Sequence, residues 1–238
     1  MRIAVDLHIH SALSPCGEDD MTPNNIVNMA VLKELDVIAI TDHNSAENVE
    51  SALQCARDKD IVVIPGMEIE TREEIHVVCF FPDLETVLKM QHIVYEALPD
   101  LKNREDIFGK QLIMDSNDDI KGRVDRLLLT ATSLSLEDVH KTAHDLGGIM
   151  IPAHVDRDSY SVLSNLGMIP EYLDLKYLEI SRTCDLIKLT EEIPELKKYR
   201  FIRSSDAHTL GDIFERESLM EVDEKSINGL LRQLREET

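Results

Sequence analysis

The chain has 238 residues and a formal net charge of −21, with 46 acidic against 25 basic side chains. Such an acidic surface repels duplex DNA and anionic lipid. We therefore expect neither as a partner. The sequence contains no run of about 18 apolar residues and begins directly with a strand-like pattern rather than a signal peptide, which predicts a cytoplasmic protein.

Short apolar runs alternate with amphipathic stretches along the chain. A helix is predicted to begin at Pro23, with Thr22 as its N-cap. Further helices are expected over about 46–58, 84–97 and 136–146, and near the C-terminus from 227. Continuous apolar strands that alternate with helices predict an α/β fold with a parallel, helix-covered sheet. The expected strands are residues 3–7, 36–40, 61–65, 75–80, 149–152, 177–180 and 201–204.

Residues 98–133 interrupt this alternation with a polar, charged stretch. Because it is longer than an ordinary connection, we expect an inserted lid or cap over a site. We find no linker or internal repeat, so residues 1–238 are interpreted as one domain. The four cysteines form no C-x-x-C pair, which favours reduced thiols over a disulfide framework or a structural zinc site.

Metal-ligating side chains stand where the predicted strands end. Alternation along the first strand puts His8 and His10 on one side, where both imidazoles can reach one ion, and Asp6 shares that side and would orient a ligand. In barrels, the active site is assembled from such carboxyl ends of strands. Comparable residues at or in the other strands are His43, Glu68, His76, His154, Asp206 and His208.

Nitrogen and oxygen donors without a cysteine cluster suit Zn, Mn or Fe. A carboxylate such as Glu68 can bridge two cations, and paired cations stabilise the attacking and leaving oxygens of phosphoryl transfer. Bound cations also lower the pKa of water from about 15.7 toward about 7, which yields hydroxide at neutral pH. The pattern therefore predicts a metal-dependent hydrolase.

In chain order the motifs read HxH, TDHN, a strand-end glutamate, HxV, AH and SDAH, and they span Asp6 to His208. This series resembles the PHP superfamily, named for polymerase and histidinol phosphatase. The resemblance implies a distorted (β/α)7 TIM-like barrel with two or three divalent metal ions. By the same resemblance, the first ion is held by His8, His10, Glu68 and Asp206, the second by Glu68, His76 and His154, and the third by His43 and His208.

The loop after the HxH motif departs from the pattern of relatives, in which it supplies one more ligand to the third ion. Here the loop reads Ser-Pro-Cys-Gly-Glu-Asp-Asp, and its register leaves Cys16, Glu18, Asp19 and Asp20 all open as that ligand.

The expected reaction is hydrolysis of a small phosphate ester, a nucleotide phosphodiester or monoester, by a metal-bridging hydroxide. Asp206, His208 and His43 would assist proton transfer. Arg157 follows the AH motif and Arg182 follows the sixth strand, and their guanidinium groups suit a phosphate. Two alternatives remain: an amidohydrolase-like enzyme that cleaves C–N bonds, and a noncatalytic metal-binding module of the same fold.

Overall fold

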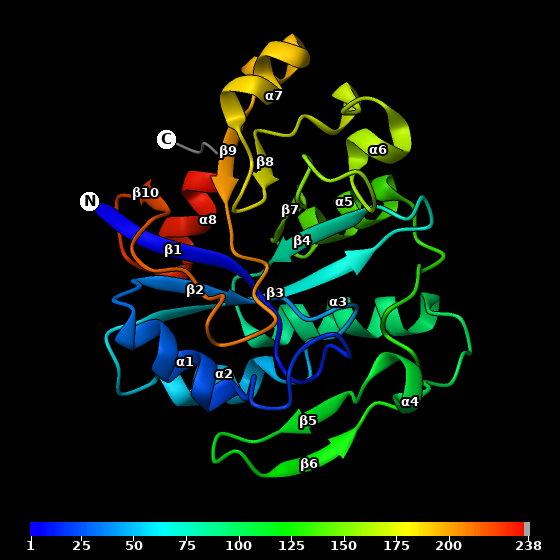
Figure 1. The fold of residues 1–238 in the computed structure, drawn as a ribbon, viewed down its shortest axis with the longest axis vertical. Helices are drawn as coiled ribbons and strands as arrows, with labels where there is room; N and C mark the ends of the chain where they lie inside the picture. Colours follow the sequence, from blue (N-terminus) through cyan, green and yellow to red (C-terminus); the bar gives the residue numbers. More distant parts are fainter. Residues whose placement is uncertain (236–238) are drawn as a thin grey trace.

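A six-stranded sheet runs through the centre of the molecule (Figure 1). The computed structural model describes residues 1–235. The strand order is β10-β1-β2-β3-β4-β7. The bounds are β1 (Arg2–Ile9), β2 (Val37–Ile40), β3 (Val62–Glu70), β4 (His76–Phe80), β7 (Ile149–Pro152) and β10 (Leu219–Glu221). A separate parallel pair, β8 (Tyr177–Ile180) and β9 (Arg200–Arg203), lies beyond β7.

The sheet is mixed, so the prediction of a parallel sheet throughout is wrong. Strands β1, β2 and β3 are parallel, whereas β4 pairs antiparallel with both β3 and β7, and β10 pairs antiparallel with β1. The physical reason is the short turn between Glu70 and His76, which can join only antiparallel neighbours because a parallel crossover needs a dozen or more residues. The result is a curled half-barrel, and a complete (β/α)7 barrel is not confirmed.

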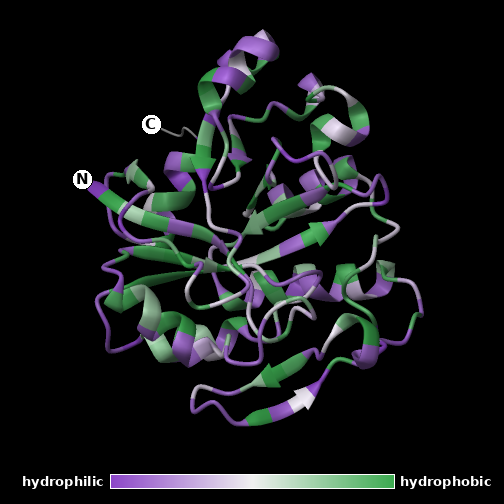
Figure 2. Cartoon of the chain, viewed as in Figure 1, coloured by the Kyte–Doolittle hydropathy of each residue, from purple (hydrophilic) through white to green (hydrophobic). Residues whose placement is uncertain are grey.

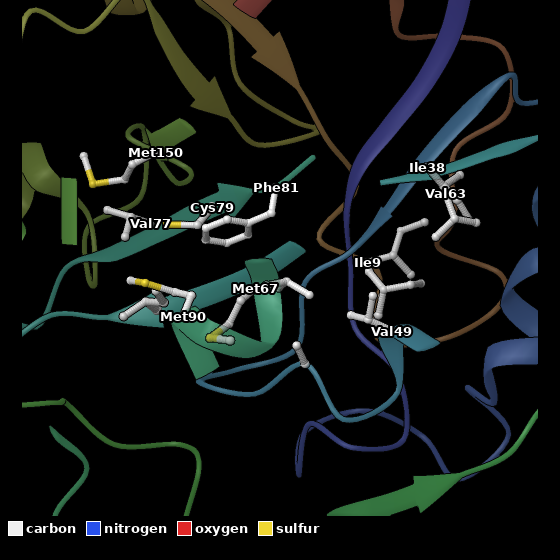
Figure 3. Close-up of a cluster of buried hydrophobic side chains, with 14 of the residues drawn as sticks. Ile9, Ile38, Val49, Val63, Met67, Val77, Cys79, Phe81, Met90 and Met150 are labelled. Atoms are coloured by element: carbon white, nitrogen blue, oxygen red, sulfur yellow. The ribbon is translucent and has the colours of Figure 1, made fainter. Parts of the chain in front are cut away.

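Four helices cover the outer face of the sheet. They are α1 (Pro23–Leu32), α2 (Val49–Ala56), α3 (Leu84–Ala97) and α5 (Leu136–Asp145). The predicted start of the first helix is confirmed, because the Thr22 side chain accepts a hydrogen bond from the Asn25 amide and Pro23 occupies the first turn. Figure 3 shows outer-face side chains from β1, β2, β3, β4 and β7 beside residues of α2 and α3.

The inner face of the sheet encloses a second apolar cluster. Leu7, Val37 and Phe80 belong to this cluster, together with Tyr177 and Ile202 from the β8–β9 pair. The helix α8 (Ile227–Arg235) adds Leu230, Leu231 and Leu234 to it. Figure 2 shows hydrophobic colour along the central strands and mixed colour on the surrounding helices. Within residues 1–235, no helix combines the length and apolar character needed to cross a bilayer.

The predicted insert forms a short helix and a hairpin, α4 (Glu105–Phe108), β5 (Leu112–Met114) and β6 (Ile120–Arg123). Figure 1 shows the hairpin at the edge of the molecule below α1 and α2. It is attached through the Leu112 amide, which donates to the Ala12 carbonyl at 2.8 Å, and the Met114 amide, which donates to Asn48 Oδ1 at 2.9 Å. The remaining elements are α6 (Val162–Leu166), α7 (Leu186–Glu192) and two 3₁₀ helices, Glu171–Leu173 and Pro194–Lys198.

Candidate metal centre

An irregularity in β1 aims His8 and His10 at the same point. The register of β1 against β2 shifts between Asp6 and Ile9. Before the shift Leu7 faces the inner core, and after it Ile9 faces the outer core. A bulge of this kind re-aims side chains. The Nε2 atoms of His8 and His10 lie 3.1 Å apart, so both imidazoles reach one point as predicted, although β1 does not alternate regularly through this stretch.

The prediction that Asp6 orients a histidine is not supported by its contacts. Asp6 Oδ1 accepts from the Ser205 amide, and Oδ2 accepts from the Phe214 amide, each at 3.0 Å. Asp6 therefore ties β1 to the loop after β9, because the bulge separates it from the side that carries His8 and His10. Burial raises the pKa of the Asp6 carboxyl to about 6, although these hydrogen bonds act in the opposite direction.

Glu68 lies at the centre of the cluster, and its carboxylate approaches five imidazoles. The carboxylate oxygens lie 2.8 Å from a ring nitrogen of His43 and 2.9 Å from one of His76. The distances to the ring nitrogens of the other three are longer, 3.3 Å for His154 and 3.4 Å for His8 and His10. The side chain is only 1% exposed. Although burial opposes ionisation, the charges of His76, His8 and His43 hold the pKa of Glu68 well below its usual value.

Asp206 completes the group around the HxH motif. Its Oδ1 lies 3.0 Å from His10 Nε2 and 3.3 Å from His8 Nε2. On the other side of the cluster, Glu68 Oε1 lies 2.9 Å from His76 Nδ1 and 3.3 Å from His154 Nε2. The structure thus brings together the residues expected for the first two cations.

A third group lies toward the mouth of the site. The ligand atoms of His10, His43 and His208 lie within 4.8 Å of one another. The loop that carries Cys16 borders this group, because the Glu18 amide donates to the His208 carbonyl at 3.0 Å. Burial alone would raise the pKa of the Cys16 thiol, but the influence of His208 and His43 outweighs it and lowers the pKa from 9.0 to about 6.

The donor set fits divalent cations. Three buried polar atoms, Glu68 Oε2, His76 Nε2 and His154 Nδ1, have no hydrogen-bond partner, which is costly for buried polar groups in the absence of a ligand. Two further groups of close ligand atoms are His8 with His10 and Glu68, and His43 with Glu68 and His76. Imidazole and carboxylate donors in this proportion are typical of Zn, Mn and Fe sites.

Several residues that position the ligands were missed by sequence reasoning. Glu179 of β8 is 2% exposed and lies 3.0 and 3.1 Å from His8 Nδ1, so it accepts the ring proton and leaves His8 Nε2 directed at the cluster. The Ser14 hydroxyl donates to Asp42 Oδ1 and therefore accepts from His10 Nδ1 at 2.9 Å. Such partners fix the tautomer and ring orientation of a ligating histidine. The sequence signal for Glu179 was a single carboxylate within an otherwise apolar predicted strand.

Two of the predicted ligands have a left-handed backbone. The φ angle is 31° at His154 and 53° at Asp206. Residues other than glycine adopt this region at a cost of order 1–3 kcal/mol, and such positions gather at functional sites. The conformation turns both side chains from the strand ends toward Glu68 and His10, which lie within 3.3 Å of them.

The structure places the two predicted phosphate-binding arginines differently. Arg157 donates from Nη1 to Asp206 Oδ2 at 2.7 Å, and its side chain is 44% exposed. Arg182 instead pairs with Glu217 at 2.7 Å and lies over the Phe214 ring, at 4.5 Å from its centroid. Only Arg157 is thus brought to the cluster. Four basic residues of the insert pair with nearby carboxylates, as Lys110 does with Asp19.

The fold and these clusters define an α/β protein whose donor set fits divalent metal. The model of the PHP domain family matches residues 6–155. The chain belongs to this family, which confirms the resemblance of its motifs.

Two relatives extend the comparison. The chain is 27% identical over 162 residues to uncharacterized protein MJ0043 of Methanocaldococcus jannaschii, over 68% of this chain. It is 24% identical over 243 residues to uncharacterized protein YqxK of Bacillus subtilis, over 89% of this chain. The chain spans 17% and 56% of the lengths of these two proteins.

Solved structures show the same fold. Endonuclease Q of Pyrococcus furiosus, a lesion-specific endonuclease, is similar over the whole chain with a TM-score of 0.72 at 20% identity, and the chain covers 57% of it. A Bifidobacterium adolescentis protein proposed to be a metal-dependent phosphoesterase has a TM-score of 0.63 at 17% identity, with 96% of this chain and 95% of that one covered.

One of these likenesses corrects an expectation about partners. A structure of Endonuclease Q holds a 27-mer duplex with an abasic lesion at the active site, and its TM-score with this chain is 0.71 at 19% identity, over 100% of this chain and 57% of that one. The prediction that duplex DNA is excluded as a partner is therefore wrong. It relied on net charge, whereas contact with a phosphate backbone depends on the local charge around a site, where bound cations act.

Proposed function

We propose that the chain hydrolyses phosphate esters at this cluster with two or three divalent cations, Zn, Mn or Fe. The observation that carries the proposal is the position of Glu68, whose two oxygens lie within 3.4 Å of five imidazoles. The first cation is assigned to His8, His10, Glu68 and Asp206, the second to Glu68, His76 and His154, and the third to His43 and His208.

When bound, such cations act as Lewis acids and lower the pKa of water, which supplies the nucleophile that a slow phosphate ester hydrolysis requires. The chain contributes binding and orientation. Arg157 uses one N–H group on Asp206, and the rest of its guanidinium, at the exposed mouth, is free to bind a phosphate oxygen.

Proton transfer to the leaving oxygen is assigned to Asp206, His208 and His43. His208 is the best placed of the three because its side chain is 28% exposed, against 7% for each of the others. Its Nδ1 donates to the Asp206 carbonyl at 2.8 Å, which fixes the tautomer and leaves Nε2 to hold the third cation, so Nε2 transfers a proton only when two cations are bound and the third position is empty.

We further propose a nucleotide phosphodiester or monoester as the class of substrate. Tyr160 supports it, because its ring stacks on His76 with centroids 4.8 Å apart while the residue is 48% exposed. An exposed aromatic face at the rim of a phosphate site offers a platform for a base. Endonuclease Q, whose fold is similar, acts on DNA lesions, which favours the same class.

The test is hydrolysis by protein loaded with Mn²⁺ or Zn²⁺, with the bound ions counted by elemental analysis. The panel contains bis(p-nitrophenyl) phosphate, p-nitrophenyl phosphate and dinucleotides, with cyclic amides as the alternative C–N substrates. We expect turnover of a phosphate ester that is lost in Glu68→Gln and kept in Glu217→Gln, whose carboxylate lies at the surface. Fully loaded protein that cleaves only amides, or nothing, would contradict the proposal.

A further inference from the structure

The insert is joined to the metal centre by buried polar side chains at two places. We propose that the insert, residues 98–133, holds the ligating histidines in place as a rigid buttress, and that Asn48 is the positioning residue that connects the two. The inference rests on the proposed metal centre and deepens it, because it assigns part of the grip on the cations to a segment outside the ligand set.

Asn48 makes the connection on the side of the insert. It occupies the N-cap of α2, where asparagine ordinarily bonds the first turn of its own helix, yet its side chain makes no capping bond. Its Oδ1 accepts from the Met114 amide at 2.9 Å, and its Nδ2 donates to the Leu112 carbonyl at 3.0 Å, both on β5. The second hydrogen of Nδ2 is directed at Ser11 Oγ, 2.9 Å away. The Asn48 side chain therefore links β5 to the loop after the HxH motif.

The network of hydrogen bonds continues through Ser11 and Asp42 to Ser14. Ser11 Oγ accepts from Asn48 and donates to Asp42 Oδ2 at 2.6 Å. Asp42 Oδ1 accepts from the Ser11 amide and from Ser14 Oγ, each at 2.7 Å. Three donors thus converge on the Asp42 side chain, which serves as an acceptor only. All four residues of this network are fully buried, so water does not compete for their hydrogen bonds.

Ser14 is the residue of the network that contacts the ligands. Its hydroxyl proton is used on Asp42, so its oxygen accepts from His10 Nδ1 at 2.9 Å and from the His43 amide at 3.1 Å. The first contact leaves Nε2 of His10 directed at the first cation position. The second fixes the backbone of a ligand assigned to the third cation. Any shift of Asp42 is therefore transmitted to two ligands at once, because one proton and two lone pairs are all that a hydroxyl offers.

A second contact joins the insert to the TDHN segment. Asn44 follows His43 directly, is fully buried and has a left-handed backbone with a φ angle of 49°. Its Nδ2 donates to the carbonyls of Leu128 and Thr130, near the end of the insert, at 2.7 and 2.9 Å. Its Oδ1 accepts from the Glu70 amide at 3.1 Å, at the end of β3. The insert thus holds this segment at a second point, beside a ligand of the third cation.

These bonds make the insert a fixed part of the centre. A buried polar network in which every member is bonded rigidifies the groups that it joins. Ligands held near their bound positions bind a cation more tightly, and the residues behind them control that placement. Breaking the network should therefore weaken the grip on the cations although no ligand is changed. A lid would act on the substrate instead, so the two roles predict different results.

Two serine variants of the full chain form a matched pair. Ser11→Ala removes the hydroxyl that joins Asn48 to Asp42. Ser51→Ala removes a buried hydroxyl of α2 that donates to the Met114 carbonyl at 2.7 Å, and so ties the same strand to α2 alone. Zn²⁺ affinity is measured in competition with a chromophoric chelator. We expect Ser11→Ala to bind Zn²⁺ about 3- to 30-fold more weakly, Asn48→Ala to be impaired at least as much, and Ser51→Ala to stay within about twofold of the parent.

A second readout requires no metal. Hydrogen exchange of the His43 amide, followed by NMR in protein stripped of metal, reports on the bond of this amide to Ser14 Oγ. We expect the exchange to become about 3- to 30-fold faster in Ser11→Ala and to stay unchanged in Ser51→Ala. Circular dichroism confirms that each variant is folded, and Ser11→Ala carries the test if Asn48→Ala does not fold.

Three results would overturn the inference. The first is a Zn²⁺ affinity or a His43 exchange rate in Ser11→Ala that equals that of the parent. The second is an equal loss in Ser51→Ala, which would show a general effect on stability. The third is a raised KM for bis(p-nitrophenyl) phosphate at unchanged Zn²⁺ affinity, as a lid would give. If the parent protein binds no Zn²⁺, the proposed metal centre fails, and the exchange rate alone decides whether the insert positions His43.

Discussion

Replacement of Glu179 tests whether a residue that touches no cation in our assignment controls how tightly the cations are held. The carboxylate is 2% exposed, lies 3.0 Å from His8 Nδ1 and also accepts from the His154 amide at 3.2 Å. In Glu179→Gln the side chain keeps its shape but loses its charge, and the amide nitrogen that replaces Oε2, 3.1 Å from His8 Nδ1, cannot accept the ring proton. His8 then loses the anionic partner that raises its basicity as a ligand.

The loss of such a partner costs about 10- to 100-fold in metal affinity, or about 1.4 to 2.7 kcal/mol. The assay is a Zn²⁺ titration in competition with a chromophoric chelator, run on the parent protein, Glu179→Gln and the surface control Glu217→Gln. We expect only Glu179→Gln to bind the first cation more weakly. An affinity within about twofold of the parent, at unchanged folding, would refute the reasoning.

Three further predictions concern stability and thiol reactivity. Removal of the cations with a chelator should lower the melting temperature, because ions at a free concentration of about 100 times their Kd stabilise the fold by about 2.7 kcal/mol; calorimetry showing no change would contradict this. Phe80→Ala should cost about 3–5 kcal/mol in urea unfolding, because the side chain is 1% exposed in the inner core, and a loss below about 1 kcal/mol would count against that packing. Burial raises the pKa of the Cys184 thiol to about 11. Its alkylation by iodoacetamide, followed by mass spectrometry, should therefore be slow at pH 8 and should increase about tenfold per pH unit up to that pKa. A rate that levels off near pH 9 would contradict this prediction.

The sequence predicted the elements of the fold better than their directions. Apolar runs and helix caps located the strands and helices, as at Thr22 and Pro23. The antiparallel direction of β4 escaped prediction, because a buried apolar strand has the same composition in either direction. The length of the connection carried the information instead: the five residues between Glu70 and His76 are too few for a parallel crossover.

The candidate site shows a similar division. The motifs located its imidazoles and carboxylates, since each motif ends a strand and strand ends meet at one edge. The alternation rule failed at Asp6, because a bulge changes the face of β1 between that residue and Ile9. The contact of Glu179 with His8 could not be inferred, because it depends on how β8 approaches β1 in space.

The left-handed backbone at His154 and Asp206 sets stability against metal retention. Glycine accepts these φ angles without the steric cost borne by histidine or aspartate. A library of variants selected only for survival of heating, in a chelating buffer, should therefore accumulate glycine at both positions. Such variants would be more stable to heat but would bind metal more weakly, because the substitutions remove ligating side chains at the strand ends.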